Sequence, residues 1–431
     1  MKLTIHRGAH QIGGSCVELN ADGARLILDL GLPLVKRDGS PLTWSRTRPA
    51  LRDLLADGTL PRIRGFYAGD RPSVTALVVS HAHLDHCGLA DYVHPDIPVW
   101  ASEGTRALLE ASRLFLPQAP AARRFLALPK WEPTPLGPFT VTGYLVDHSA
   151  PDALALLVEG AGSRVFYSGD LRAHGRKAVL FERMLTRPPR DIDCLLLEGT
   201  MVGRGKQAYA SERDVENALA EVFEAKQNLG LVFCSSQNID RLVSLYRAAR
   251  RSSSILVLDL YTAYLLRAMR CISDRLPQFD WEGVRVKYWK SHADCLATGG
   301  RKDFLYEARA SKIEVGEIVD LRRRVVMLAK SNRLLPIIPR YLPDLGGLEL
   351  IWSMWPGYLT GEDAVSRFCA KHGLGLRHVH TSGHATVEDL QRLARAIKPQ
   401  RLVPIHTFEA ERFREAFDNV TLVDDGEETS V

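Results

Sequence analysis

The chain has 431 residues, of which 45% are hydrophobic and 25% charged, a balance typical of a globular protein and not of a disordered or fibrous one. This length is too great for one ordinary hydrophobic core, so we expect two domains. The net charge of +5 permits a polyanionic partner without requiring one. There is no apolar run of membrane-span length and no signal-peptide core, and the seven cysteines are scattered. We therefore expect a cytoplasmic protein with no membrane partner.

Taken in chain order, the first expected element is a hairpin of two strands, 13–19 and 25–31. Asp29 lies near the end of its second strand. A carboxylate there can accept the spare N–H of a metal-bound imidazole and fix its tautomer. A cap of a helix or turn explains Asp29 equally well on local grounds. Residues 33–71 follow as a basic, irregular insertion.

The strongest functional signal is a cluster of metal-binding residue types at positions 81–87, which read His-Ala-His-Leu-Asp-His-Cys. The preceding residues, 76–80, are apolar and β-prone, so a buried strand should end here. Such a strand brings imidazoles and a carboxylate to one point at the edge of a sheet, and these groups suit zinc and its first-row neighbours. A His-rich surface loop without an ion is the weaker alternative, because the cluster directly follows a core strand.

Three further candidate ligands also follow strand-like segments. His148 comes after residues 142–147, Asp170 after 164–169 and His406 after 402–405. Each of them alone would be an ordinary capping or solvated group. Their shared position at strand ends favours one metal centre.

Residues 81–86 resemble the HxHxDH signature of the metallo-β-lactamase fold, an αββα sandwich. The resemblance implies two adjacent divalent ions, zinc or alternatively manganese. It places His81 and His83 at one ion and Asp85 and His86 at the other. Asp170 would be the carboxylate shared by both ions. The full implied ligand set is His81, His83, Asp85, His86, His148, Asp170 and His406.

Asp170 and His406 are separated by 235 residues, far more than a loop can contain, so a whole domain must lie between them. Capping residues at Ser211 and Thr386 each precede a helical pattern. Strands are expected at 231–234, 255–258, 325–328 and 348–352, and their alternation with helices favours a mostly parallel sheet. We therefore expect a discontinuous first domain, 1–204 and 376–431, with an inserted α/β domain, 205–375.

An α/β domain inserted into this scaffold resembles the plan of the β-CASP nucleases. Residues 195–200, which contain Glu198, resemble their motif A. Residues 381–385, which contain His384, resemble motif B, and residues 404–407 resemble motif C. The blocks 168–176 and 382–385 are similar to ribonuclease J, whereas 14–16 and 86–88 are equally similar to the endonuclease of pre-mRNA 3′-end processing. Motif C departs from the ribonuclease J pattern, because Thr407-Phe408 replaces Gly-Glu, which leaves exonuclease and endonuclease both open.

The resemblance implies hydrolysis of phosphodiester bonds in single-stranded nucleic acid, with RNA favoured over DNA. Asp85 and Asp170 would act through the ions, and His384 would protonate the leaving alkoxide. Glu198 would hold His384 in its donor tautomer and raise its pKa. The competing interpretations are a structural imidazole for His384 and a helix cap for Glu198.

Substrate contacts are expected from small polar residues and one cation: Ser235, Ser236, Asn238, Ser382, Gly383 and Arg172. The segment from Ser235 to Asn238 lies between a strand and a helix, where phosphate can bind, and an ordinary N-cap is an equally good explanation. For Arg172 a solvated charge is the alternative.

Two rival functions remain. A metallo-hydrolase of a small ester or phosphoester would keep the metal centre but would have no use for the inserted domain. A non-catalytic partner would typically have lost ligands, and every expected ligand type is present. A homodimer is compatible with the sequence. After residues 402–405 and His406 we expect a terminal helix and then a frayed acidic tail, 424–431.

Overall fold

The computed structural model describes residues 1–431 except 35–47, 122–123 and 331–333. The expected insertion at 33–71 therefore lies partly outside the described residues, and its remainder includes helix α1 (Leu51–Ala56). By its internal contacts the chain divides into two compact units. Unit 1 comprises Met1–Gly205 and Gly383–Val431, and unit 2 comprises Lys206–Ser382.

Unit 1 is built on two sheets. The first has the order β20 (Glu428–Ser430), β1 (Lys2–Arg7), β2 (Cys16–Ala21), β3 (Ala24–Leu28), β4 (Ala76–Val78), β5 (Val99–Ala101) and β6 (Phe125–Ala127). The second has the order β19 (Arg401–Ile405), β11 (Cys194–Glu198), β10 (Ser163–Tyr167), β9 (Leu154–Gly160), β8 (Phe139–Leu145) and β7 (Pro133–Leu136). Both are mixed sheets, since β3 to β6 run parallel, as do β10, β11 and β19.

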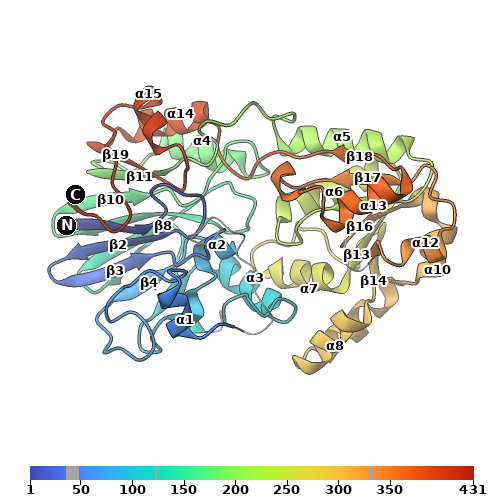
Figure 1. Ribbon diagram of the computed structural model, residues 1–431, viewed down its shortest axis with the longest axis horizontal. Coiled ribbons are helices and arrows are strands. Elements are labelled where there is room, and N and C mark those ends of the chain that lie inside the picture. Colours follow the sequence, from blue (N-terminus) through green and yellow to red (C-terminus); the bar gives the residue numbers. More distant parts are fainter. Residues whose placement is uncertain (35–47, 122–123, 331–333) are drawn as a thin grey trace. The chain divides into compact units, whose positions relative to one another are not determined.

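The main core of unit 1 lies between these sheets. Alternate residues of the facing strands, such as Leu28 on β3 and Leu156 on β9, belong to one fully buried apolar cluster. The outer face of the second sheet, represented by Leu195 on β11, is covered by α4 (Ala178–Thr186) and α14 (Val387–Ile397). The segment between β3 and β6 adds α2 (Leu84–Cys87) and α3 (Glu103–Arg113) beside the first sheet (Figure 1). These two facing sheets and their helices agree with the expected fold class, a metallo-β-lactamase αββα sandwich.

Unit 2 is an α/β layer structure with one fully parallel sheet. Its order is β15 (Lys312–Ile313), β14 (Val284–Lys287), β13 (Ile255–Asp259), β16 (Val325–Leu328), β12 (Gly230–Phe233), β17 (Glu349–Trp352) and β18 (Leu376–His378). The α-helices of its described residues are α5 (Glu212–Ala225), α6 (Ile239–Arg251), α7 (Leu260–Ala268), α8 (Lys290–Thr298), α9 (Lys302–Glu307), α10 (Val315–Asp320), α12 (Ile338–Tyr341) and α13 (Ala364–His372). Four of these strands overlap the predicted ones, and the parallel arrangement is confirmed. Their continuous burial is what a sheet covered on both faces requires.

The prediction of a frayed acidic tail is wrong. Residues Glu428–Ser430 form β20, which pairs antiparallel with β1 and brings the two termini side by side (Figure 1). Asp425 also accepts a hydrogen bond from the backbone N–H of Ala9 at 2.9 Å. Without β20, the outer edge of β1 would expose unpaired backbone groups, which explains why even an acidic segment is ordered there. The expected terminal helix is reduced to the four residues of α15 (Phe413–Ala416).

Among the helices in the described ranges, none is long and apolar enough to cross a lipid bilayer.

Candidate metal centre

The loop after β4 and the short helix α2 carry four of the expected ligands. The backbone N–H groups of Leu30 and Leu32 donate to the carbonyl oxygens of His86 and Leu84 at 2.9 and 2.8 Å, which fixes α2 against the end of β3. A Cβ atom at Gly31 would overlap the carbonyl of Asp85. This close backbone approach requires glycine.

Three imidazoles and one carboxylate form a first group of possible ligands. The Nδ1 atom of His83 lies 3.2 Å from Nε2 of His81 and 3.1 Å from Nε2 of His148. The carboxylate Oδ2 of Asp170 lies 3.7 Å from Nε2 of His81 and 4.0 Å from Nε2 of His148. Donor atoms of these four residues all lie within 4.8 Å of one another, close enough to share one ion.

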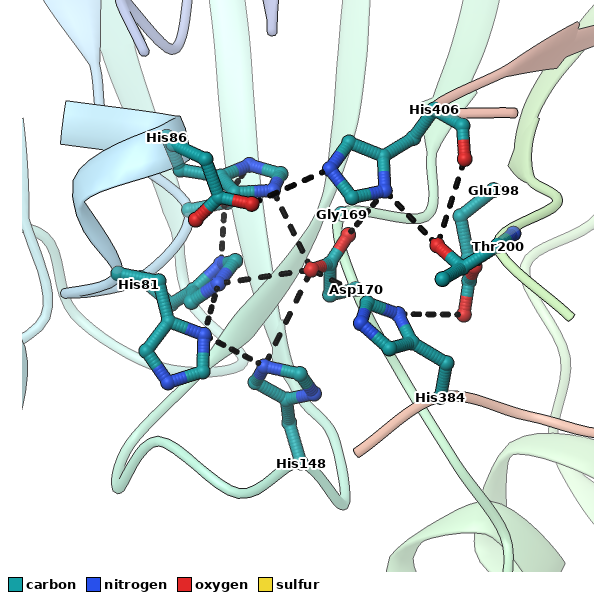
Figure 2. Close-up of polar contacts among 12 residues, drawn as sticks. His81, His86, His148, Gly169, Asp170, Glu198, Thr200, His384 and His406 are labelled. Atoms are coloured by element: carbon teal, nitrogen blue, oxygen red, sulfur yellow. Dashed lines mark hydrogen bonds and ion pairs between the residues drawn. The ribbon is translucent and has the colours of Figure 1, made fainter. Parts of the chain in front are cut away.

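A second group forms on the other side of Asp170, as Figure 2 shows. The Nε2 atom of His86 lies 3.2 Å from Oδ2 of Asp170. His406 lies between the two carboxylates, with Nε2 3.4 Å from Oδ2 of Asp85 and Nδ1 3.7 Å from Oδ1 of Asp170. Asp170 therefore belongs to both groups.

Buried polar atoms without hydrogen-bond partners show, independently of the sequence motif, that these imidazoles and carboxylates suit a divalent cation. Among the residues that the structure describes, Nε2 of His86, Nε2 of His406 and Oδ1 of Asp170 are buried and have no hydrogen-bond partner. Buried polar atoms without partners are costly, and here three of them converge within one ligand group. Imidazole and carboxylate are the ligands that zinc accepts, so a cation can satisfy all three atoms.

Hydrogen bonds from outside the ligand set fix the orientation of two imidazoles. The Nδ1 atom of His86 lies 2.7 Å from Oδ2 of Asp29, which also accepts a hydrogen bond from the Tyr167 hydroxyl at 2.6 Å. The Nδ1 atom of His148 lies 2.7 Å from the carbonyl oxygen of Gly383. In both rings Nδ1 must carry the proton, which leaves Nε2 to face the centre.

Two residues of the centre have left-handed backbone conformations. The φ angles of Asp29 and His406 are 60° and 53°. Residues with side chains rarely adopt this conformation, and such local strain is concentrated at functional sites.

The electrostatics of the first group favour neutral imidazoles around an ionised carboxylate, whereas in the second group Asp170 and Asp29 outweigh burial and raise the pKa of His86. Burial lowers the pKa of His81, His83 and His148. Burial opposes ionisation of Asp170 too, but His406 and His86 outweigh it and hold the pKa of this carboxyl well below its usual value. Neutral imidazole and ionised carboxylate are the forms that bind metal.

His384 and Glu198 lie beside the ligand groups. The Nδ1 atom of His384 is 3.4 Å from Oε1 of Glu198 and 3.7 Å from Oδ2 of Asp170. Burial works against the charged form, but Glu198 and Asp170 raise the pKa of His384 above its ordinary value. Glu198 is fully buried, and its Oε2 accepts the N–H of Thr200 at 2.9 Å. This imidazole is therefore prepared to hold a proton near the centre.

The residues expected to bind substrate differ in burial and in the hydrogen bonds that they make. Within unit 2, Asn238 caps α6 by accepting the N–H of Arg241 at 3.0 Å, as the N-cap alternative describes. Ser236 is buried and accepts a hydrogen bond from the Lys330 ammonium at 2.9 Å, whereas Ser235 is exposed. The backbone N–H of Ser382 donates to the side-chain oxygen of Gln207.

Gly383 and Arg172 belong to unit 1. A Cβ at Gly383 would lie 3.0 Å from Oγ of Ser149, so little space is left there. Arg172 is fully buried, with Nε 3.7 Å from Oδ1 of Asp147, and it is not the solvated surface cation that the alternative described.

Sequence reasoning missed three polar residues of this region: Asp147, Tyr167 and Thr200. Oγ1 of Thr200 lies 2.9 Å from Nδ1 of His406. Each of the three lies within three residues of a residue that the motifs had singled out, and this proximity was the only available signal.

Comparison with known proteins agrees with this geometry. Residues 51–231 match the "Beta-lactamase superfamily domain" family, and residues 374–422 match the "Zn-dependent metallo-hydrolase RNA specificity domain" family. Ribonuclease J from Sinorhizobium meliloti is 26% identical over 81% of this chain and 60% of its own length. Ribonuclease J from Mycobacterium tuberculosis is 26% identical over 94% of this chain and 68% of its own length. This chain thus spans only about two thirds of the length of these relatives.

A crystal structure of a protein of unknown function from Enterococcus faecalis V583 superposes with a TM-score of 0.77 and covers 99% of both chains. At 22% sequence identity, this similarity shows only that the two chains share a fold. Fold, donor groups and family matches together support a metallo-hydrolase with the metallo-β-lactamase fold that uses divalent metal. Within that class the chain is similar to ribonuclease J, the resemblance that its motifs predicted.

Proposed function

We propose that the protein hydrolyses phosphodiester bonds of single-stranded RNA with two bound zinc ions, manganese being the alternative metal. The observation that carries this proposal is the position of Asp170, whose carboxylate belongs to both ligand groups. When bound, two ions at such a site supply a nucleophile near neutral pH and neutralise charge on the phosphodiester.

In this proposal the ligands divide between the two ions. His81, His83 and His148 would hold one ion, and Asp85, His86 and His406 would hold the other. Asp170 would contribute to both sites. Asp29 keeps His86 in the tautomer that presents Nε2, through its 2.7 Å contact with Nδ1.

His384 supplies the proton that the leaving sugar alkoxide needs. Glu198 and Asp170 raise the pKa of His384, which favours the protonated ring, and Glu198 at 3.4 Å orients Nδ1. With Nδ1 directed at Glu198, Nε2 is the atom that donates to the leaving group. Glu198 is fully buried and acts through His384.

RNA is the favoured substrate for two reasons. The relatives that align with most of this chain are named Ribonuclease J, and residues 374–422 match a family described by RNA specificity. Exposed Ser235 and the segment Ser382–Gly383 are the retained candidates for phosphate contacts, whereas Ser236 and Arg172 are buried and Asn238 caps α6. DNA and small esters are the alternative substrates.

We also place the protein in the cytoplasm. All seven cysteines are free thiols in the structure, and Cys16 and Cys87 are among the buried ones. Free thiols persist in a reducing compartment.

The test incubates the zinc-loaded protein with end-labelled single-stranded RNA, the matching DNA and a small phosphodiester, each with and without chelator. We expect chelator-sensitive cleavage of RNA. Ladder-like loss from one end would identify an exonuclease, and internal products an endonuclease. Cleavage of the small phosphodiester alone, or no cleavage of either polymer by metal-replete protein, would contradict the proposal.

A further inference from the structure

Two loops that carry proposed ligands are joined by a buried ion pair. Asp147 directly precedes His148, and Arg172 follows Asp170 by two residues. Asp147 is 1% exposed and Arg172 is fully buried, and Nε of Arg172 lies 3.7 Å from Oδ1 of Asp147. The backbone N–H of Arg172 also donates to the carbonyl oxygen of Asp147 at 2.7 Å. The two loops are therefore connected through both backbone and side chains.

Further contacts close the same junction. The second carboxylate oxygen of Asp147 accepts the N–H of Gly175 at 2.7 Å. A Cβ at Gly175 would overlap both the Asp147 carboxylate and the Arg172 guanidinium, so glycine allows the backbone to pass this close. The ammonium of Lys177 donates to the carbonyl oxygen of His148 at 3.1 Å and lies 3.8 Å from Oδ1 of Asp147.

The junction also reaches the loop of the proposed proton donor. The backbone N–H of Ala385 donates to the carbonyl oxygen of Leu171 at 2.7 Å. The carbonyl oxygen of Gly383, on the other side of His384, lies 2.7 Å from Nδ1 of His148. The loops of His148, Asp170 and His384 thus form one connected structure.

We propose that Asp147 and Arg172 are positioning residues for the metal centre: their ion pair holds His148 and Asp170 at the separation that one shared ion requires. Nε2 of His148 and Oδ2 of Asp170 lie 4.0 Å apart. Each member of the pair is at most two residues from a ligand, so a shift of either loop moves a donor atom directly. A buried cation without its carboxylate is strongly disfavoured, so Arg172 would move if Asp147 lost its charge.

This inference rests on the proposed function, because it presumes an ion held by His148 and Asp170. It gives Arg172 a role different from substrate binding. The positioning role also differs from a purely structural role, in which loss of the ion pair would lower stability without changing the affinity for metal.

The test has two readouts: zinc affinity, measured by competition with a chromophoric chelator, and thermal unfolding of the metal-free protein. The variants are Asp147→Asn and Arg172→Gln. Glu18→Gln is the matched control, since it also removes charge from a buried carboxylate in unit 1 that pairs with an arginine, Arg25. We expect zinc affinity to fall by roughly 10- to 100-fold in Asp147→Asn and Arg172→Gln, the usual effect of changing residues behind the ligands, and to stay at the wild-type value in Glu18→Gln.

A conservative variant keeps the inference testable if Arg172→Gln folds poorly. Arg172→Lys retains a cation opposite Asp147 and should recover part of the lost affinity. If Asp147→Asn and Arg172→Gln unfold at lower temperature but bind zinc like the wild type, the positioning role is overturned. Wild-type protein that binds zinc but does not cleave RNA would contradict the proposed function and leave this inference intact, whereas wild-type protein that binds no zinc would contradict both.

Discussion

At the scale of single residues, the centre separates residues that face the proposed ions from residues that orient them. Asp85 contacts His406 at 3.4 Å within a ligand group, whereas His384 lies beside that group and contacts Glu198. In the proposed function, metal binding and proton donation therefore depend on different side chains, and substitutions should separate the two.

We predict that Asp85→Ala and His384→Ala each lower turnover of RNA by at least about 100-fold, since the first weakens an ion site and the second removes the general acid. Only Asp85→Ala should reduce the metal content of the purified protein. Metal analysis beside single-turnover kinetics checks this. Equal loss of metal in both variants would show that the roles are wrongly assigned.

The sequence indicated the centre at this scale because many of its residues follow strand ends, and four lie in one run, His81 to His86. The carboxyl ends of neighbouring strands meet at one edge of a sheet. The position of each residue after a strand was therefore enough to predict that these residues, distant in the sequence, lie close together in the fold. Asp147 and Arg172 could not be predicted as a pair, because a single charged residue is usually solvated and only the fold shows which one is buried.

At the scale of elements, the position of α2 depends on close backbone contact with the end of β3. We predict that Gly31→Ala lowers the free energy of unfolding by about 2 kcal/mol or more and weakens zinc binding, because the new Cβ would displace the carbonyl of Asp85. Gly205→Ala is the control, since a Cβ there meets no atom within 4 Å. Chemical denaturation and zinc titration measure both effects. Gly31→Ala protein with wild-type stability and affinity would refute this account of α2.

The hairpin of β2 and β3 should make stability depend on pH. Burial opposes the charge of Glu18, but hydrogen bonds from Arg25 and His6 lower the pKa of this carboxyl to about 2 from its ordinary 4.5. Because the folded pKa is depressed, the stabilisation is present above about pH 4.5 and is lost as the pH falls toward 2.

We therefore predict that Glu18→Gln lowers the free energy of unfolding by about 1 to 2 kcal/mol at pH 7, after allowance for solvent screening. The difference from wild type should disappear near pH 2. Urea unfolding from pH 7 to pH 2 measures it. A difference that stays constant across this range would show that the Glu18 carboxylate does not gain its stability from Arg25 and His6.

Elements with strong periodicity were predictable, and elements set by tertiary pairing were not. The buried strands of unit 2 and the capped starts of α5 and α14 follow from apolar runs and from Ser211 and Thr386. The strand β20 escaped prediction because its residues are polar and acidic, and only the free edge of β1 orders them.

At the scale of the whole molecule, the chain combines a sandwich that contains the candidate metal centre with a parallel α/β unit. The proposal that this second unit contacts the substrate comes from the resemblance to the β-CASP nucleases. The sequence indicated the insertion because no loop could account for the distance between Asp170 and His406. The identity of the substrate depends on relatives that are 26% identical, so it needs the cleavage assay described above.

The central claim is a pair of divalent ions that share Asp170, and elemental analysis of the purified, unchelated protein tests it most directly. We predict two zinc or manganese ions per chain, falling to about one in the Asp85→Ala variant. Less than about one bound ion per wild-type chain, even after the metal is resupplied, would contradict the claim.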